Sequence, residues 1–284
     1  MQAGRLICER CERVRARMCE LLGMNANVPT DIRFSFSALA QRGGGTGPHR
    51  DGWGIAFYEG RGARAFHDPQ PSAHSEIARL LRDYPLKSKI VIAHVRRANR
   101  GRVALENTHP FTRELWGRAW TFAHNGQLKG VKKRSLDLYK PIGTTDSEHA
   151  FCWLLGQLRA RFSSLPSPDA LDQALGELCA DLGALGVFNV LVSEGRTLYA
   201  FCNKKLFYLV RCWPFGVATL IDEDLRVDFS TMTTPNDRVV VVASSPLTRD
   251  EVWLELPART MTVFRNGQLI PHAPKSADQR SAAP

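Results

Sequence analysis

The sequence predicts an α+β fold built in layers. Strand-like runs rich in β-branched and aromatic residues fill its first half, two helical segments occupy the middle, and more strand-like runs follow. Strands grouped apart from helices favour an α+β arrangement over alternating βαβ units. No internal repeat with a period of about 20–50 residues is present, so one domain is the simplest partition of the 284 residues.

Four strand candidates precede the helices. They are residues 18–23, 53–59, 89–95 and 119–124. The glycine-rich segment 43–48 is typical of a flexible loop. The last candidate runs directly into Asn125-Gly126, a pair that on its own is typical of a tight hairpin turn.

Two helices are predicted from their capping residues and their apolar periodicity. The first begins near Thr145, which stands three residues before Glu148 as in a capping box, and apolar residues then recur at helical spacing up to Leu158. The second opens at residues 167–168, with serine as N-cap and proline at the first helical position, and runs to about Leu185.

Five further strand candidates complete the domain. They are residues 187–193, 197–202, 206–211, 238–243 and 261–266. Residues 269–284 are largely polar and contain three prolines, a composition expected of a disordered tail. We therefore place the folded domain at residues 19–268 and treat residues 1–18 as an extension.

Composition and charge exclude several classes of protein. The chain is 44% apolar and 23% charged, as in ordinary globular proteins. No run of about 18 apolar residues is present, so we expect no membrane span. The net charge is +10, but the basic residues are scattered apart from 132–134 and 204–205, so we interpret them as solvated surface and predict no nucleic-acid partner. No glycine-rich phosphate loop is found, and we expect no cofactor.

Seven cysteines at irregular spacing argue against a disulfide framework. The first residues are basic and lack the apolar core of a secretory signal, so the expected location is the cytoplasm. Cys8 and Cys11 form a CxxC pair, which supplies two of the four ligands that a structural zinc site needs. Because no second pair exists, we predict no metal site.

Four short segments carry the residues of chemical interest: 18–23 (MCELLG), 94–96 (HVR), 124–126 (HNG) and 145–148 (TDSE). Each has an ordinary explanation when taken alone. An arginine at a strand end is usually exposed to solvent, and an aspartate in a first helical turn complements the helix dipole. Their combination and order along one chain carry the functional interpretation.

Together these segments resemble the class II glutamine amidotransferases, which have the N-terminal-nucleophile hydrolase fold. The likeness continues through residues 42–44 (RGG), 51–54 (DGWG) and 107–111 (NTHPF), spans roughly residues 18 to 265, and is greatest to small stand-alone bacterial members. The resemblance implies a four-layer αββα sandwich, with two stacked antiparallel sheets between helical layers.

The resemblance implies that Cys19 is the nucleophile, exposed as the first residue once Met18 is removed. A thiol with a reference pKa of about 8.5 needs a base, and a free α-amino group has a reference pKa of about 7.7–8.0. Only an N-terminal residue carries both groups on one Cα, since an internal residue has an amide nitrogen instead. The Asn125 side-chain amide and the Gly126 N–H are the implied oxyanion-hole donors.

The resemblance also implies that Arg96 binds the α-carboxylate of glutamine and that Asp146 binds its α-ammonium group. A guanidinium fork matches a carboxylate, and a carboxylate matches an ammonium group. The expected reaction is that of a glutaminase: ammonia leaves the γ-carboxamide, and water then hydrolyses a γ-glutamyl thioester to glutamate. Residues 97–101 read RANRG where several relatives carry WATHG, so no side-chain role is transferred there.

The residues ahead of Cys19 have three interpretations. Met18 is the true start of the protein, or residues 1–18 are a propeptide that is cleaved, or they are a genuine extension that abolishes catalysis. We expect the active form to lack them. In the third case the chain would be a catalytically silent glutamine-binding protein.

The substrate is a small molecule in every catalytic interpretation. A γ-glutamyl peptide presents the same α-carboxylate and α-ammonium groups as glutamine, so Arg96 and Asp146 do not distinguish the two. The chain has no synthase domain, which permits a separate synthase as a partner that receives the ammonia.

Overall fold

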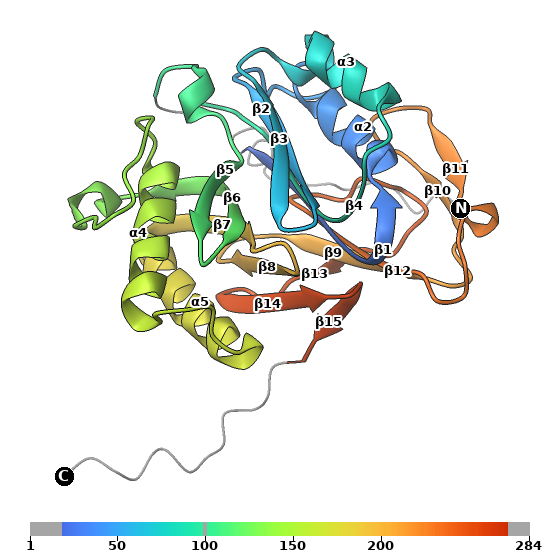
Figure 1. Cartoon of the computed structure of the whole chain (residues 1–284). Coiled ribbons are helices and arrows are strands. Elements are labelled where there is room, and N and C mark those ends of the chain that lie inside the picture. Colours follow the sequence, from blue (N-terminus) through green and yellow to red (C-terminus); the bar gives the residue numbers. More distant parts are fainter. Residues whose placement is uncertain (1–18, 99–100, 272–284) are drawn as a thin grey trace, which may run out of the picture.

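The computed structural model describes residues 19–98 and 101–271. Two stacked sheets lie between two pairs of helices, which gives the four layers implied by the family resemblance (Figure 1). Three hydrophobic clusters fill the spaces between the layers. One lies between the first sheet and α2 and α3, one between the two sheets, and one between the second sheet and α4 and α5.

The first sheet has the strand order β13-β9-β12-β1-β4-β2-β3, and all its neighbouring strands are antiparallel. Its strands are β1 (Glu20–Asp31), β2 (Trp53–Glu59), β3 (Gly62–Asp68), β4 (Lys87–Val95), β9 (Phe207–Cys212), β12 (Arg238–Ala243) and β13 (Leu254–Glu255). The strand that follows Cys19 therefore lies in the middle of the sheet.

The second sheet has the order β15-β14-β8-β7-β6-β5 and is also antiparallel throughout. Its strands are β5 (Phe111–Leu115), β6 (Arg118–Leu128), β7 (Gly186–Ser193), β8 (Thr197–Cys202), β14 (Thr260–Arg265) and β15 (Gln268–Ile270). A separate ribbon pairs β10 (Val217–Thr219) with β11 (Arg226–Asp228).

Strand β1 shows how the sequence specifies two buried faces. Successive side chains of a strand point to opposite sides of the sheet. Leu21 accordingly packs between the two sheets, whereas Leu22 packs toward the helices. Both side chains are fully buried, so adjacent leucines at this point of the strand serve two different hydrophobic clusters.

The α-helices within residues 19–271 are α2 (Arg33–Arg42), α3 (Glu76–Asp83), α4 (Asp146–Arg161) and α5 (Pro168–Gly183). Short 3-10 helices occur at η1 (Ser72–His74), η2 (Leu105–Asn107), η3 (Val131–Lys133) and η4 (Phe229–Thr231). Thr145 caps α4 as predicted, because its Oγ1 accepts the Glu148 N–H at 3.1 Å. The reciprocal half of the capping box is absent. The Glu148 carboxylate instead accepts the N–H groups of Ile142 and Gly143 and pairs with Arg113.

The sequence analysis missed several helices and strands, and it ended one strand too early. Helices α2 and α3 and strands β3, β5, β10, β11, β13 and β15 were not predicted. Strand β6 passes through Asn125 and Gly126, which pair with Asn189 and Phe188 of β7, so the Asn-Gly pair makes no hairpin turn. Cys8, Cys11 and the predicted tail beyond residue 271 lie outside the described residues. Within the described ranges, no helix is long and apolar enough to cross a membrane.

Candidate active site

A cavity of about 230 Å³ lies where the beginning of β1 meets β6 and the first turn of α4. All five predicted site residues line it, although they come from distant parts of the chain. Cys19 precedes β1, Arg96 follows β4, Asn125 and Gly126 belong to β6, and Asp146 is the first residue of α4. The fold thus brings together the four segments that the sequence analysis singled out.

The Cys19 thiol faces the backbone of the segment that follows β4. Its Sγ accepts the Arg97 N–H at 3.2 Å and lies 3.4 Å from the Arg97 carbonyl oxygen, to which the thiol donates. Burial raises the pKa of this thiol to about 11, while the Arg97 N–H and the charge of Arg96 act in the opposite direction. The thiol is therefore neutral near pH 7 unless a base accepts its proton.

Asn125 reaches the nucleophile from the neighbouring sheet. Its Nδ2 donates to the Cys19 carbonyl oxygen and lies 3.4 Å from the Ser244 Oγ. Gly126 follows with a φ of +151°. A Cβ at this position would lie 1.9 Å from the Val187 carbonyl oxygen, so only glycine fits and the backbone of β6 remains open toward the cavity.

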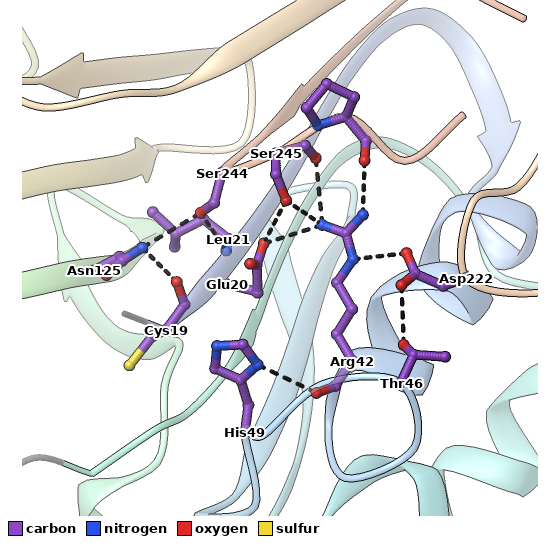
Figure 2. Close-up of polar contacts among 11 residues, drawn as sticks. Cys19, Glu20, Leu21, Arg42, Thr46, His49, Asn125, Asp222, Ser244 and Ser245 are labelled. Atoms are coloured by element: carbon purple, nitrogen blue, oxygen red, sulfur yellow. Dashed lines mark hydrogen bonds and ion pairs between the residues drawn. The ribbon is translucent and has the colours of Figure 1, made fainter. Parts of the chain in front are cut away.

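A buried ionic cluster fixes the residues that follow Cys19 (Figure 2). Arg42 pairs with Glu20 at 3.1 Å and with Asp222 at 2.8 Å. It also donates to the backbone after β12, through the Pro246 carbonyl at 2.7 Å. Ser244 completes the anchor, because its Oγ accepts the Leu21 N–H at 2.9 Å. The backbone at the start of β1 is thereby held from both sides.

Arg96 is buried and held by the segment that precedes β2. Its backbone N–H donates to the Gly52 carbonyl at 2.7 Å, and its Nη1 contacts the carbonyl oxygens of Asp51 at 3.4 Å and Arg102 at 3.3 Å. The Asp51 carboxylate accepts the Ala98 N–H at 2.7 Å. The DGWG motif therefore shapes the cavity wall around Arg96.

Asp146 joins α4 to β6. One carboxylate oxygen accepts the Leu128 N–H at 2.7 Å, and the other accepts the Ser147 N–H at 3.0 Å. The helix dipole alone does not account for this residue, since the contact with Leu128 ties the helix to the strand that carries Asn125 and Gly126.

Three buried histidines surround this site and carry no charge near neutral pH. His124 donates from Nε2 to the Val187 carbonyl at 3.0 Å, so its Nδ1 accepts from the Ser147 hydroxyl at 2.8 Å. The rings of His94 and His109 lie 4.4 Å apart. Burial lowers the pKa of His94 to about 3 and lowers that of His109 well below its usual value. His109 lies in the cavity wall.

Several residues around the site escaped the sequence analysis. Ser244 and Ser245 lie in no recognised motif, and Glu20, Arg42 and Asp51 stood in motifs without an assigned role. Their buried ion pairs and hydrogen bonds join positions that are 22 to 225 residues apart, a separation that periodicity and spacing do not reveal. In the described part of the chain, no group of three or more His, Cys, Asp or Glu residues is placed to hold a metal ion.

Comparisons with known proteins identify the family of this chain. Residues 18–284 match the family of class II glutamine amidotransferases. YafJ of Escherichia coli strain K12 is 57% identical over 254 residues, which are 89% of this chain and all of YafJ. The crystal structure of a predicted glutamine amidotransferase from Pseudomonas aeruginosa PA01 superposes with a TM-score of 0.72 at 47% identity, over 89% of this chain and all of that one.

A more distant structure shows the fold alone. Phosphoribosylpyrophosphate amidotransferase of Bacillus subtilis superposes with a TM-score of 0.51 at 16% identity, over 87% of this chain and 49% of that one. The layered α+β architecture of this protein is thus the N-terminal-nucleophile hydrolase fold. The chain belongs to the class II glutamine amidotransferase family.

Proposed function

We propose that the form of the protein that begins at Cys19 hydrolyses the γ-carboxamide of glutamine or of a related γ-glutamyl amide. The observation that carries this proposal is the single cavity that gathers a thiol, an amide donor, a guanidinium and a carboxylate. Arg96 and Asp146 recognise the α-carboxylate and the α-ammonium group of the substrate. The side-chain amide of the substrate is then directed to Cys19.

The reaction is an acyl transfer in two steps. The α-amino group of Cys19 takes the thiol proton, and Sγ attacks the γ-carbonyl carbon. Asn125 Nδ2 and the Gly126 N–H stabilise the oxyanion. Ammonia leaves with the proton returned from the α-amino group, and water hydrolyses the γ-glutamyl thioester to glutamate, which frees Cys19 again.

The environment of the thiol explains why the chain must begin at Cys19. With a pKa of about 11, only about one thiol in ten thousand is ionised at pH 7. While Met18 is attached, the nitrogen of Cys19 is an amide and accepts no proton. Removal of residues 1–18 frees the α-amino group of Cys19 as the base, and we propose that the protein is catalytically inactive while these residues are retained.

The test is to measure ammonia and glutamate release by protein whose mass shows that it begins at Cys19. The same protein carrying Cys19→Ala and the full 284-residue chain are the controls. We expect turnover only in the first preparation. Equal turnover in the Cys19→Ala variant would exclude this nucleophile, and equal turnover in the full chain would exclude the α-amino base.

A γ-glutamyl peptide is a second candidate substrate, favoured by one further observation. A larger groove of about 730 Å³ shares Gln127 and Val187 with the cavity, which offers space for an amine leaving group bulkier than ammonia. Comparing kcat/KM for glutamine with kcat/KM for γ-glutamyl dipeptides decides between them. A higher value for glutamine would identify a glutaminase.

A further inference from the structure

Asn189 lies directly opposite Asn125 in the antiparallel pair of β7 and β6. Side chains of directly opposed residues point to the same face of a sheet, and their Cβ atoms are about 4.5–5.5 Å apart. Both side chains are buried, with exposed fractions of 0% for Asn189 and 1% for Asn125. The two amides therefore meet in an environment that excludes water.

Each of the two amides has one polar atom without a partner among the described residues. For Asn125 this is the acceptor Oδ1, and for Asn189 it is the donor Nδ2. The other end of each amide is occupied: Asn125 Nδ2 donates to the Cys19 carbonyl, and Asn189 Oδ1 accepts the Lys204 N–H at 3.3 Å. The two vacant atoms are thus a donor and an acceptor on facing side chains.

We propose that Asn189 is a positioning residue for the oxyanion hole, whose Nδ2 donates to Asn125 Oδ1 in the catalytic form. This hydrogen bond fixes the Asn125 amide with its Nδ2 toward Cys19. It also polarises the amide, which strengthens Nδ2 as a donor to developing negative charge. The proposal rests on the proposed function, because it assigns a partner to the oxyanion-hole residue.

Asn189 acts through Asn125 and does not touch the substrate. The cavity that holds Cys19 is lined by Asn125 but not by Asn189. The expected signature is therefore a lower kcat with an unchanged KM, since substrate contacts are retained.

Asn189→Asp is the decisive variant, because it keeps the Oδ1 that accepts the Lys204 N–H and exchanges the Nδ2 donor for a carboxylate oxygen, which cannot donate when ionised. Asn25→Asp is its matched control. Asn25 is also a strand residue with an exposed fraction of 1%, its Oδ1 accepts the Gly267 N–H at 2.7 Å, and its Nδ2 has no partner among the described residues. It stands six residues from Cys19 along β1, roughly 20 Å away.

Both variants are compared with the parent in protein that begins at Cys19. We expect Asn189→Asp to lower kcat about tenfold to a hundredfold with KM within about twofold, a smaller effect than loss of an oxyanion donor itself. Asn25→Asp should leave kcat within about twofold. When Asn125 is already alanine, Asn189→Asp should change kcat by less than about threefold, because both changes act on one interaction. Equal losses of kcat in Asn189→Asp and Asn25→Asp would overturn the proposal. So would a double variant in which the losses caused by Asn125→Ala and Asn189→Asp are additive.

A second measurement does not depend on turnover. In protein that begins at Cys19 and is labelled with ¹⁵N-asparagine, the side-chain amide signals of Asn125 are assigned by their loss in Asn125→Ala. We expect Asn189→Asp to shift these signals and Asn25→Asp to leave them in place. Unmoved signals would overturn the pairing even if the enzyme is active. Shifted signals in a protein without glutaminase activity would retain the pairing and refute only the proposed function.

Discussion

The guanidinium of Arg42 lies 3.1 Å from the carboxylate of Glu20, and both side chains are only 8% exposed. Arg42 belongs to α2 and Glu20 to β1, so this ion pair ties the residue after the predicted nucleophile to a neighbouring layer. Removing one partner of a buried pair leaves an uncompensated charge, which is far more destabilising than the pair is stabilising.

Arg42→Met should therefore lower the free energy of unfolding by about 3–5 kcal/mol, because Glu20 and Asp222 both lose their cation. Urea unfolding followed by circular dichroism measures the change. Arg64→Met removes an exposed pair with Glu59 and should leave the free energy of unfolding nearly unchanged. Equal shifts in the two variants would contradict an anchoring role for Arg42.

Gly126→Ala should destabilise the protein by about 2 kcal/mol or more, because the new Cβ meets the Val187 carbonyl oxygen and the φ of +151° disfavours any side chain. The control is Gly156→Ala, since the added Cβ in α4 has no atom within 4 Å. That change should be neutral or stabilising by up to about 1 kcal/mol. Urea midpoints that fall equally for both would rule out the close contact.

Asp146→Asn should raise the KM for glutamine about tenfold to a hundredfold, as expected for the loss of one hydrogen bond to a charged group. The asparagine retains an oxygen that can accept the Leu128 N–H, which Asp146 accepts at 2.7 Å, so α4 and β6 should remain joined. Steady-state kinetics on protein that begins at Cys19 measures the effect. Asp137→Asn makes the same change on an exposed residue and should leave KM unchanged. An unchanged KM in Asp146→Asn would remove this residue from substrate binding.

Acid should destabilise the fold through His94 and His109. Burial depresses the pKa of both rings in the folded protein, whereas an unfolded histidine has a pKa of about 6.5. The unfolded state therefore binds more protons as the pH falls, and stability that is fully present above pH 6.5 is lost below it. Each histidine contributes a slope of about 1.4 kcal/mol per pH unit, which for His94 continues toward pH 3.

Urea midpoints measured between pH 7.5 and pH 5 record this slope. His94→Asn should reduce the slope of stability against pH by the contribution of one histidine, even if the variant is less stable at every pH. A parent protein whose stability is constant over this range would show that the two rings already take up protons in the folded state.

For most elements, predictability followed from how local the signals are; α3 is an exception, because Ser75 caps it locally and it was still missed. Thr145 and Ser167 cap α4 and α5 through their own side chains, and both helices were predicted from those residues. Helix α2 begins after Ile32, whose side chain cannot cap it, so the usual N-cap residue is missing from the sequence at this position. Strands β3 and β5 are stabilised by pairing with neighbours, which a local pattern does not show.

The residues of the site also differ in whether the sequence predicted them. Cys19, Arg96, Asn125, Gly126 and Asp146 were predicted because each stands in a short motif that resembles a known family. The groups that hold them were not predicted. Ser244 meets Leu21 across 223 residues of sequence, and Asn125 meets Cys19 across 106. The first pair arises where β12 pairs with β1 within one sheet, and the second arises from the stacking of the two sheets, so only the folded chain reveals them.

Because β1 lies between β12 and β4, the proposed enzyme would begin its chain in the middle of a sheet. The first residues of a protein usually fray, since nothing pairs with them on either side. Here Glu20 is already aligned with Val95, and Leu22 with both Ala93 and Ala243. A chain that starts at Cys19 would therefore present its reactive end on one of its most rigid strands, and the amine and thiol would need no ordering before they meet a substrate.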